Sequence, residues 1–142
     1  MKKLFLFFVA IAFSVASFAH SDENWQESDM LKNMQSEDKA ALLMVHFGTS
    51  YDDTRAATID ALNKKAQQEF PQLAFAEAYT SRMIINILGK RGVEKDTPLE
   101  ALLKLRAAGF THIVVQSSNV IDGAEMESLR KDIAQVEQFF KE

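Results

Sequence analysis

The sequence predicts an α/β fold, a small parallel sheet flanked by helices, with its elements in the order β-α-β-α-α-β-α. Three short apolar runs alternate with segments in which apolar residues recur every three or four positions, and prolines and glycines separate the two kinds of segment. Strands that alternate with helices form parallel sheets through right-handed crossovers. We therefore expect a single α/β lobe over residues 40–142.

The first half of this lobe contains two of the strands. Residues 40–47 (AALLMVHF) form a continuous apolar run, which is typical of a central strand buried on both faces. A loop over residues 48–53 follows, and helical spacing predicts a helix over residues 54–70. A second strand is expected over residues 73–79, and a short helix over residues 81–90.

The second half contains the third strand between two helices. Residues 97–100 (TPLE) combine a capping box with a proline at the first helical position, so a helix begins there, and Gly109 ends it. Residues 112–116 (HIVVQ) predict the third strand. After a polar loop, the apolar spacing over residues 124–140 predicts a last amphipathic helix.

The first 39 residues differ in composition from the lobe. Residues 1–19 combine two lysines, an apolar run and a small-x-small site, which predicts a signal peptide and export to a bacterial periplasm. Residues 20–39 are polar and acidic, and we interpret them as a leader. Cleavage after residue 19 would remove two lysines and change the net charge from −4 to −6. This acidity argues against nucleic acid as a partner, and no membrane association is expected after cleavage.

The binding site is expected at the carboxyl ends of the strands, where parallel sheets bind their ligands. The loops over residues 48–53, 79–82 and 117–125 meet at that edge. The chain has no cysteine, so thiolate ligands for a metal are excluded.

Candidate residues in the first of these loops have two interpretations each. His46, near the end of the first strand, is either a hydrogen-bonded core histidine or a ligand for a metal or haem. Gly48, Thr49 and Ser50 either line an anion site at a helix start or form a turn whose hydroxyls cap that helix.

The other two loops carry further candidates. Arg82 is either a clamp for a carboxylate or a solvated residue at a helix start. Asn119, Asp122 and Glu125 either point into the cleft, where a carboxylate binds a cation or accepts protons, or serve as turn and first-turn residues.

Four segments in series resemble the anaerobic cobalt chelatases, the sirohydrochlorin cobaltochelatases, including their exported forms. They are VHFGTSYDDT, EAYTSRMIINIL, DTPLEALLKLRAAGFTHIVVQS and NVIDGAEME, and they extend over residues 40–127. The resemblance implies a chelatase-like fold, in which two similar α/β lobes hold a macrocycle between them. It also implies insertion of Co²⁺, or Fe²⁺ in some members, into sirohydrochlorin, a tetrapyrrole with eight carboxylates.

The resemblance also implies roles for particular residues. Glu125 matches the glutamate that helps to receive the metal, and Gly48, Thr49 and Ser50 match the loop that lines the tetrapyrrole cleft. Asn119 stands where the family usually has a histidine.

The family's two metal-binding histidines lie in a second lobe, so this chain is expected to represent the N-terminal lobe. We expect a homodimer, or a partner chain that supplies the second lobe, with His46 as a substitute metal ligand. No organic cofactor is implied. The alternative function is a periplasmic protein that binds a tetrapyrrole, haem or a metal ion without catalysis.

Overall fold

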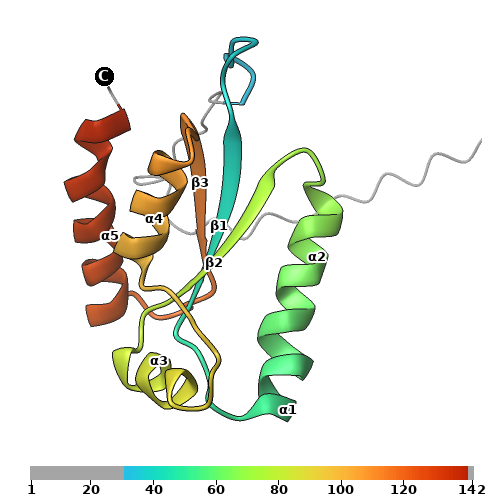
Figure 1. Ribbon diagram of the computed structural model, residues 1–142, viewed down its shortest axis with the longest axis vertical. Helices are drawn as coiled ribbons and strands as arrows, with labels where there is room; N and C mark the ends of the chain where they lie inside the picture. The colour runs from blue at the N-terminus through green and yellow to red at the C-terminus, as the bar shows by residue number, and fades with distance from the viewer. Residues whose placement is uncertain (1–30, 141–142) are drawn as a thin grey trace, which may run out of the picture.

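A computed structural model describes residues 31–140, which form a three-stranded parallel sheet with helices on both faces (Figure 1). The strands are β1 (Ala40–His46), β2 (Ala74–Tyr79) and β3 (His112–Ser117), in the order β2-β1-β3. The predicted fold class and the central position of the first strand are confirmed. The predicted signal peptide and residues 20–30 of the leader lie outside the described residues.

The helices follow the predicted order, but one of them differs from its prediction. They are α1 (Asp52–Arg55), α2 (Ala61–Glu69), α3 (Arg82–Gly89), α4 (Pro98–Ala107) and α5 (Ala124–Glu137), with a π-helical turn at Ala56–Asp60 and a 3₁₀ turn at Gln138–Phe140.

The uniform helix predicted over residues 54–70 is therefore wrong in two respects. It begins at Asp52, where two acidic residues favour the first turn, and a π-helical turn separates α1 from α2. Inside that turn the Thr58 hydroxyl donates to the Thr54 carbonyl at 2.6 Å. Such bonds compete with the regular helical pattern.

The start and the end of α4 confirm the sequence prediction. The Thr97 side chain and the Glu100 side chain cap each other's backbone N–H groups, and Pro98 occupies the first helical position. The hydrogen bond from the Thr97 backbone is the main cause that lowers the pKa of Glu100. Gly109 follows the helix with φ of 86°, a conformation that suits glycine.

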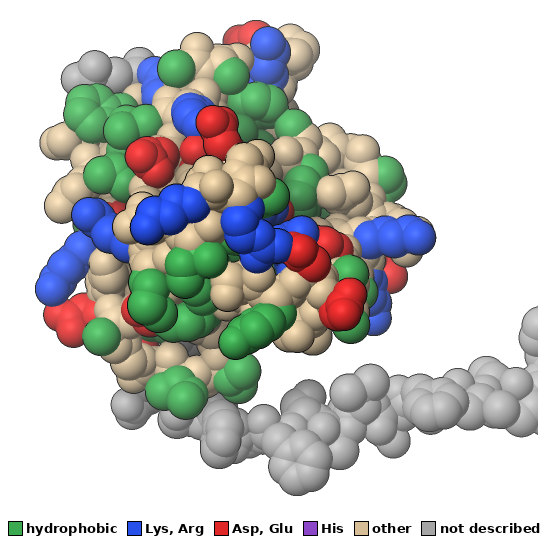
Figure 2. All heavy atoms as spheres, turned by 60° about the horizontal axis from the view of Figure 1, so that its bottom comes forward, with side chains coloured by type: hydrophobic (Ala, Val, Ile, Leu, Met, Phe, Trp, Pro, Cys, Tyr) green, Lys and Arg blue, Asp and Glu red, His purple; other side chains and the backbone are tan. Residues whose placement is uncertain are grey.

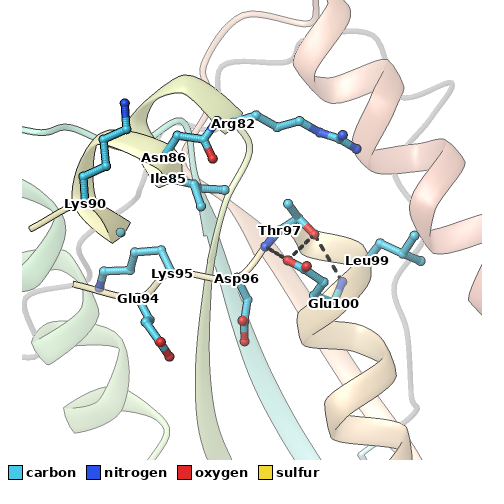
Figure 3. A pocket seen from close by; sticks show the side chains of 11 residues that line it. Arg82, Ile85, Asn86, Lys90, Glu94, Lys95, Asp96, Thr97, Leu99 and Glu100 are labelled. Atoms are coloured by element: carbon cyan, nitrogen blue, oxygen red, sulfur yellow. Dashed lines mark hydrogen bonds between the residues drawn. The ribbon is translucent and has the colours of Figure 1, made fainter. Parts of the chain in front are cut away.

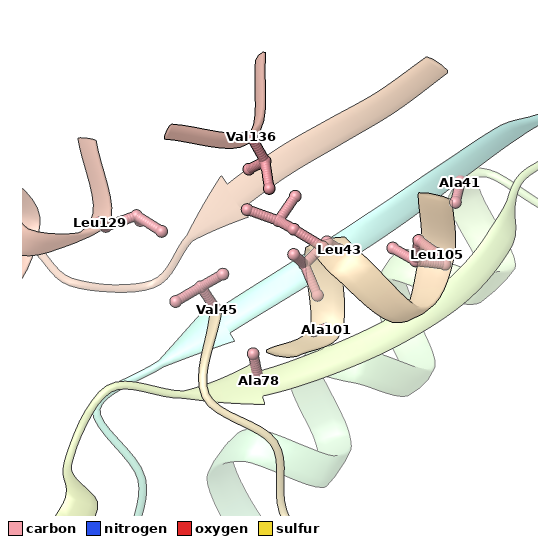
Figure 4. Packing of buried hydrophobic residues seen from close by; sticks show 9 residues of the cluster. Ala41, Leu43, Val45, Ala78, Ala101, Leu105, Leu129 and Val136 are labelled. Atoms are coloured by element: carbon pink, nitrogen blue, oxygen red, sulfur yellow. The ribbon is translucent and has the colours of Figure 1, made fainter. Parts of the chain in front are cut away.

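The main core lies between the sheet and the pair α4 and α5 (Figure 4). Leu43 and Val45 of β1 are fully buried there, and Leu105 of α4 and Val136 of α5 pack in the same cluster. Alternate residues of β1 point to the opposite face, because strand side chains alternate.

The opposite face of the sheet is covered by α2 (Figure 1). Met44 and His46 are buried on this side, and Asn63 is the buried residue of α2. A second apolar cluster, built around Tyr79 and Leu88, joins the end of β2 to α3. Across residues 31–140, no helix is both long enough and apolar enough to cross a membrane.

Candidate functional site

The three loops predicted to share one edge of the sheet begin side by side. His46 is in register with Tyr79, and Val45 is in register with Ser117. The Thr80 amide donates to the His46 carbonyl at 2.8 Å, and the Ser118 amide donates to the Val45 carbonyl at 2.9 Å. These bonds extend both ladders into the loops, so the predicted convergence at the carboxyl edge is confirmed. In Figure 1 this edge is at the bottom, beside α3.

Charged and apolar side chains share the surface at this edge. Figure 2 turns the edge toward the viewer, and Lys and Arg side chains cross the middle of the face beside a group of hydrophobic side chains. Several large apolar residues of the surrounding loops are exposed: Phe47, Val120 and Ile121 have exposed fractions of 46%, 98% and 81%. The edge therefore offers both charge and apolar area to a ligand.

The first loop turns at Gly48, where φ is 102°. A Cβ atom at this position would lie 2.5 Å from Cδ2 of Tyr79, so the loop backbone rests directly on that ring. The interpretation in which hydroxyls cap the next helix is not what the structure shows. Tyr51 is the residue before α1 and makes no side-chain capping bond, whereas the Thr49 hydroxyl accepts from the Tyr51 amide at 3.3 Å.

His46 is a buried residue whose two ring nitrogens are both hydrogen-bonded. Its Nε2 lies 2.8 Å from Oδ1 of Asn63, and its Nδ1 lies 2.8 Å from Oγ of Ser118. The amide oxygen only accepts, so Nε2 donates, and in the neutral ring Nδ1 accepts from the serine hydroxyl. The structure thus gives His46 the geometry of a hydrogen-bonded core histidine. Metal binding by His46 remains a prediction, and it would require Ser118 to leave Nδ1.

Asn63 is the partner that the sequence analysis missed. It lies four residues after Ile59 and three before Ala66, within the apolar stripe of the predicted helix. A polar residue on a buried stripe needs a hydrogen-bond partner, and this position was the available signal.

The second loop supplies Arg82, the first residue of α3. The Ser81 hydroxyl caps this helix by accepting from the Ile84 amide. The Arg82 side chain is exposed and extends toward α5 (Figure 3). It forms no ion pair with a described residue, so its guanidinium group is available to a ligand carboxylate.

Two hollows meet at Glu125, in the first turn of α5. The inner hollow, of about 90 Å³, is lined by Thr80, Arg82, Glu125 and Asp132 among others. Burial raises the pKa of Asp132, and the positive charge of Arg82 opposes that shift. The structure therefore brings Arg82 and Glu125 to one hollow, as the predicted site requires.

The outer hollow, of about 460 Å³, lies on the other side of Glu125. It is lined mostly by apolar atoms of the third loop and by Phe47, and Asn119 also borders it. The Asn119 Nδ2 atom is buried and has no hydrogen-bond partner among the described residues. Buried amide donors are normally paired, so this atom needs an acceptor. Asp122, in contrast, pairs with Arg130 at 2.7 Å on the surface, and that hydrogen bond lowers its pKa.

A third hollow, of about 860 Å³, lies between α3 and the start of α4 (Figure 3). Arg82 borders it together with residues of both charges, and most of the acidic ones are already paired. Lys104 holds Asp96 at 2.6 Å, and the capping box holds Glu100.

The structure does not assemble all the predicted site residues in one place. Thr49 and Ser50 line neither hollow beside Glu125. Over residues 31–140, no three His, Asp or Glu side chains gather closely enough to hold a metal ion. Metal binding by Glu125 therefore also remains a prediction.

Comparison with known proteins identifies similar sequences over the same segment. The profile of a family described as cobalt chelatase (CbiK) matches residues 40–142. A sirohydrochlorin cobaltochelatase of Salmonella typhimurium is 40% identical over 103 residues, which are 72% of this chain and 39% of that protein. The sirohydrochlorin cobaltochelatase CbiKC of Nitratidesulfovibrio vulgaris is 29% identical over 111 residues, which are 77% of this chain and 39% of that protein. The chain thus matches well under half the length of these relatives.

Proposed function

Because the chain belongs to the cobalt chelatase (CbiK) family, we propose that it binds sirohydrochlorin at the carboxyl edge of its sheet and contributes to the insertion of Co²⁺ into that macrocycle. The position of Glu125 carries this proposal. Its side chain borders both the inner and the outer hollow, with Arg82 on one side and Asn119 on the other. A carboxylate between a cation and an apolar surface suits a substrate that is a charged, largely apolar ring.

The chemistry of insertion assigns a task to each of these groups. The metal ion replaces two pyrrole protons, so the site must hold the ion near the ring and accept protons from it. The Glu125 carboxylate serves either task. The guanidinium of Arg82, which forms no ion pair with a described residue, binds a peripheral carboxylate of the substrate, and the exposed Val120 and Ile121 side chains cover the apolar face of the ring.

Val120 and Ile121 are exposed beside the outer hollow, so we propose that a second lobe closes the cleft over them. A second copy of this chain is one source, and a different chain that supplies the other lobe is the alternative. We also propose, from the pattern of residues 1–19, that the protein acts in the periplasm. Cell fractionation tests that location, and retention in the cytoplasmic fraction contradicts it.

The decisive experiment follows the absorption spectrum of sirohydrochlorin during anaerobic incubation with the purified protein and Co²⁺, with Fe²⁺ in parallel. Glu125→Gln should slow metal insertion about 100-fold, the lower range for loss of a proton-transfer group. Glu127→Gln is the matched control, because Glu127 lies in the same turn, is exposed and pairs with Lys131. An equal rate for both variants refutes the role of Glu125, and no rate above the uncatalysed one at any protein concentration refutes insertion by this chain alone or as a homodimer.

One observation favours a second candidate function, binding of a tetrapyrrole or haem without insertion. Both nitrogens of His46 are engaged within the protein, which leaves Glu125 without an imidazole from the first strand. This function predicts a stoichiometric spectral shift with sirohydrochlorin or haem and no turnover. A spectral titration with each ligand, read beside the insertion assay above, decides between the two functions. The absence of any spectral shift excludes both.

A further inference from the structure

The loop over residues 48–53, called the first rim loop below because it lies at the carboxyl edge of the sheet, has few contacts that would hold it in place beyond Gly48. Gly48 itself rests on the ring of Tyr79, as described above. The hydrogen bond between the Thr49 hydroxyl and the Tyr51 amide stays within the loop, and the Tyr51 carbonyl is used by the following helix. Thr49 and Ser50 therefore need support from another part of the molecule.

Arg91 supplies that support from the turn that follows α3. One terminal nitrogen of its guanidinium donates to the Ser50 carbonyl at 2.5 Å, and the other pairs with the Asp52 carboxylate. Among the described residues, no other hydrogen bond joins Thr49, Ser50 or Tyr51 to a segment outside the loop and its own helix. Arg91 is thus a two-point contact between the first rim loop and the turn that follows α3.

The backbone that carries Arg91 is itself well fixed. The Arg91 amide donates to the Leu88 carbonyl at 2.9 Å, and the Val93 amide donates to the same carbonyl at 3.0 Å. Leu88 is fully buried in the cluster around Tyr79. A planar guanidinium on a fixed turn reaches two acceptors in a defined geometry, which the single ammonium group of a lysine does not reproduce.

We propose that Arg91 is a positioning residue that holds Thr49 and Ser50 in the geometry in which the first rim loop binds the macrocycle. The inference rests on the proposed function and adds a residue to it that the sequence motifs do not assign. Arg91 is exposed, with 41% of its side chain accessible, and exposed ion pairs contribute little to global stability. Its effect is therefore local, on the position of the loop.

The test compares Arg91→Ala with Arg91→Lys and with Arg106→Ala. Arg106 is the matched control, because its guanidinium also donates to a backbone carbonyl, that of Phe139 at 2.7 Å, away from the rim. Two quantities are measured on each purified variant: amide hydrogen exchange at residues 49–51 without ligand, and the Kd for sirohydrochlorin without metal.

For Arg91→Ala we expect about tenfold faster exchange at Tyr51, whose amide donates to the Thr49 hydroxyl, and about tenfold weaker binding, with an unchanged melting temperature. Arg91→Lys should lie between wild type and Arg91→Ala, and Arg106→Ala should bind as wild type does. Unchanged exchange overturns the proposal, as does faster exchange with unchanged affinity. If the wild-type protein binds no macrocycle, the proposed function fails, whereas the exchange experiment still decides whether Arg91 holds the loop.

Discussion

Replacing Gly48 with alanine should distort the first rim loop for two separable reasons. The backbone at Gly48 has φ of 102°, and holding a non-glycine residue in such a sparsely populated region costs about 1–3 kcal/mol. The added Cβ would also lie 2.5 Å from the buried ring of Tyr79, and overpacking of this kind costs about 1–3 kcal/mol. We expect Gly48→Ala to lower the free energy of unfolding by about 2–6 kcal/mol.

Gly109→Ala separates the two contributions. Gly109 has φ of 86°, close to that of Gly48, but a Cβ atom there would meet nothing within 4 Å. This control should therefore cost only the backbone contribution, about 1–3 kcal/mol.

Urea unfolding followed by circular dichroism measures the stability of both variants, and titration with sirohydrochlorin measures their affinity for the macrocycle. Gly48→Ala should weaken binding of the macrocycle, whereas Gly109→Ala should leave it unchanged. If the two variants lose the same stability, the Tyr79 ring is not an obstacle and the reasoning is refuted.

Three further predictions concern burial and charge. His46→Ala should cost about 3 kcal/mol in urea unfolding, because it leaves the buried Asn63 and the half-buried Ser118 without their hydrogen-bond partner, and a loss below 1 kcal/mol contradicts the core role. Burial raises the pKa of Asp132, so its ionisation opposes folding: stability should fall as pH rises through that pKa, and Asp132→Asn should remove this dependence in unfolding curves measured from pH 3 to pH 7. The pair Val120→Ser and Ile121→Ser should leave stability within about 0.5 kcal/mol but weaken sirohydrochlorin binding about tenfold in a spectral titration.

The sheet and its binding edge could be predicted because each depends on local patterns. The strands are short apolar runs, and the start and end of α4 are defined by residues within one turn of it. The parallel arrangement then brings Gly48, Arg82 and Glu125 to one edge without further information.

The contacts within the site could not be predicted, because they join residues distant in sequence. His46 meets Asn63 and Ser118, which are 17 and 72 residues away, and Arg91 meets Ser50 from 41 residues away. Those pairings depend on the packing of helices against the sheet. The π-helical turn was missed for a different reason: Ile59, Leu62, Ala66 and Phe70 recur at ordinary helical spacing, so this pattern carries no mark of a π-helical turn.

The π-helical turn at Ala56–Asp60 determines which side of α2 faces the sheet. Each residue advances an α-helix by about 100°, so loss of one residue in this turn would rotate α2 by that amount relative to its start. Asn63 would then leave the Nε2 atom of His46, and Lys64 would take its place. The number of residues in this one turn thus fixes the rotation of the whole helix about its axis. Relatives that keep the His–Asn pair should therefore keep the number of residues between β1 and α2.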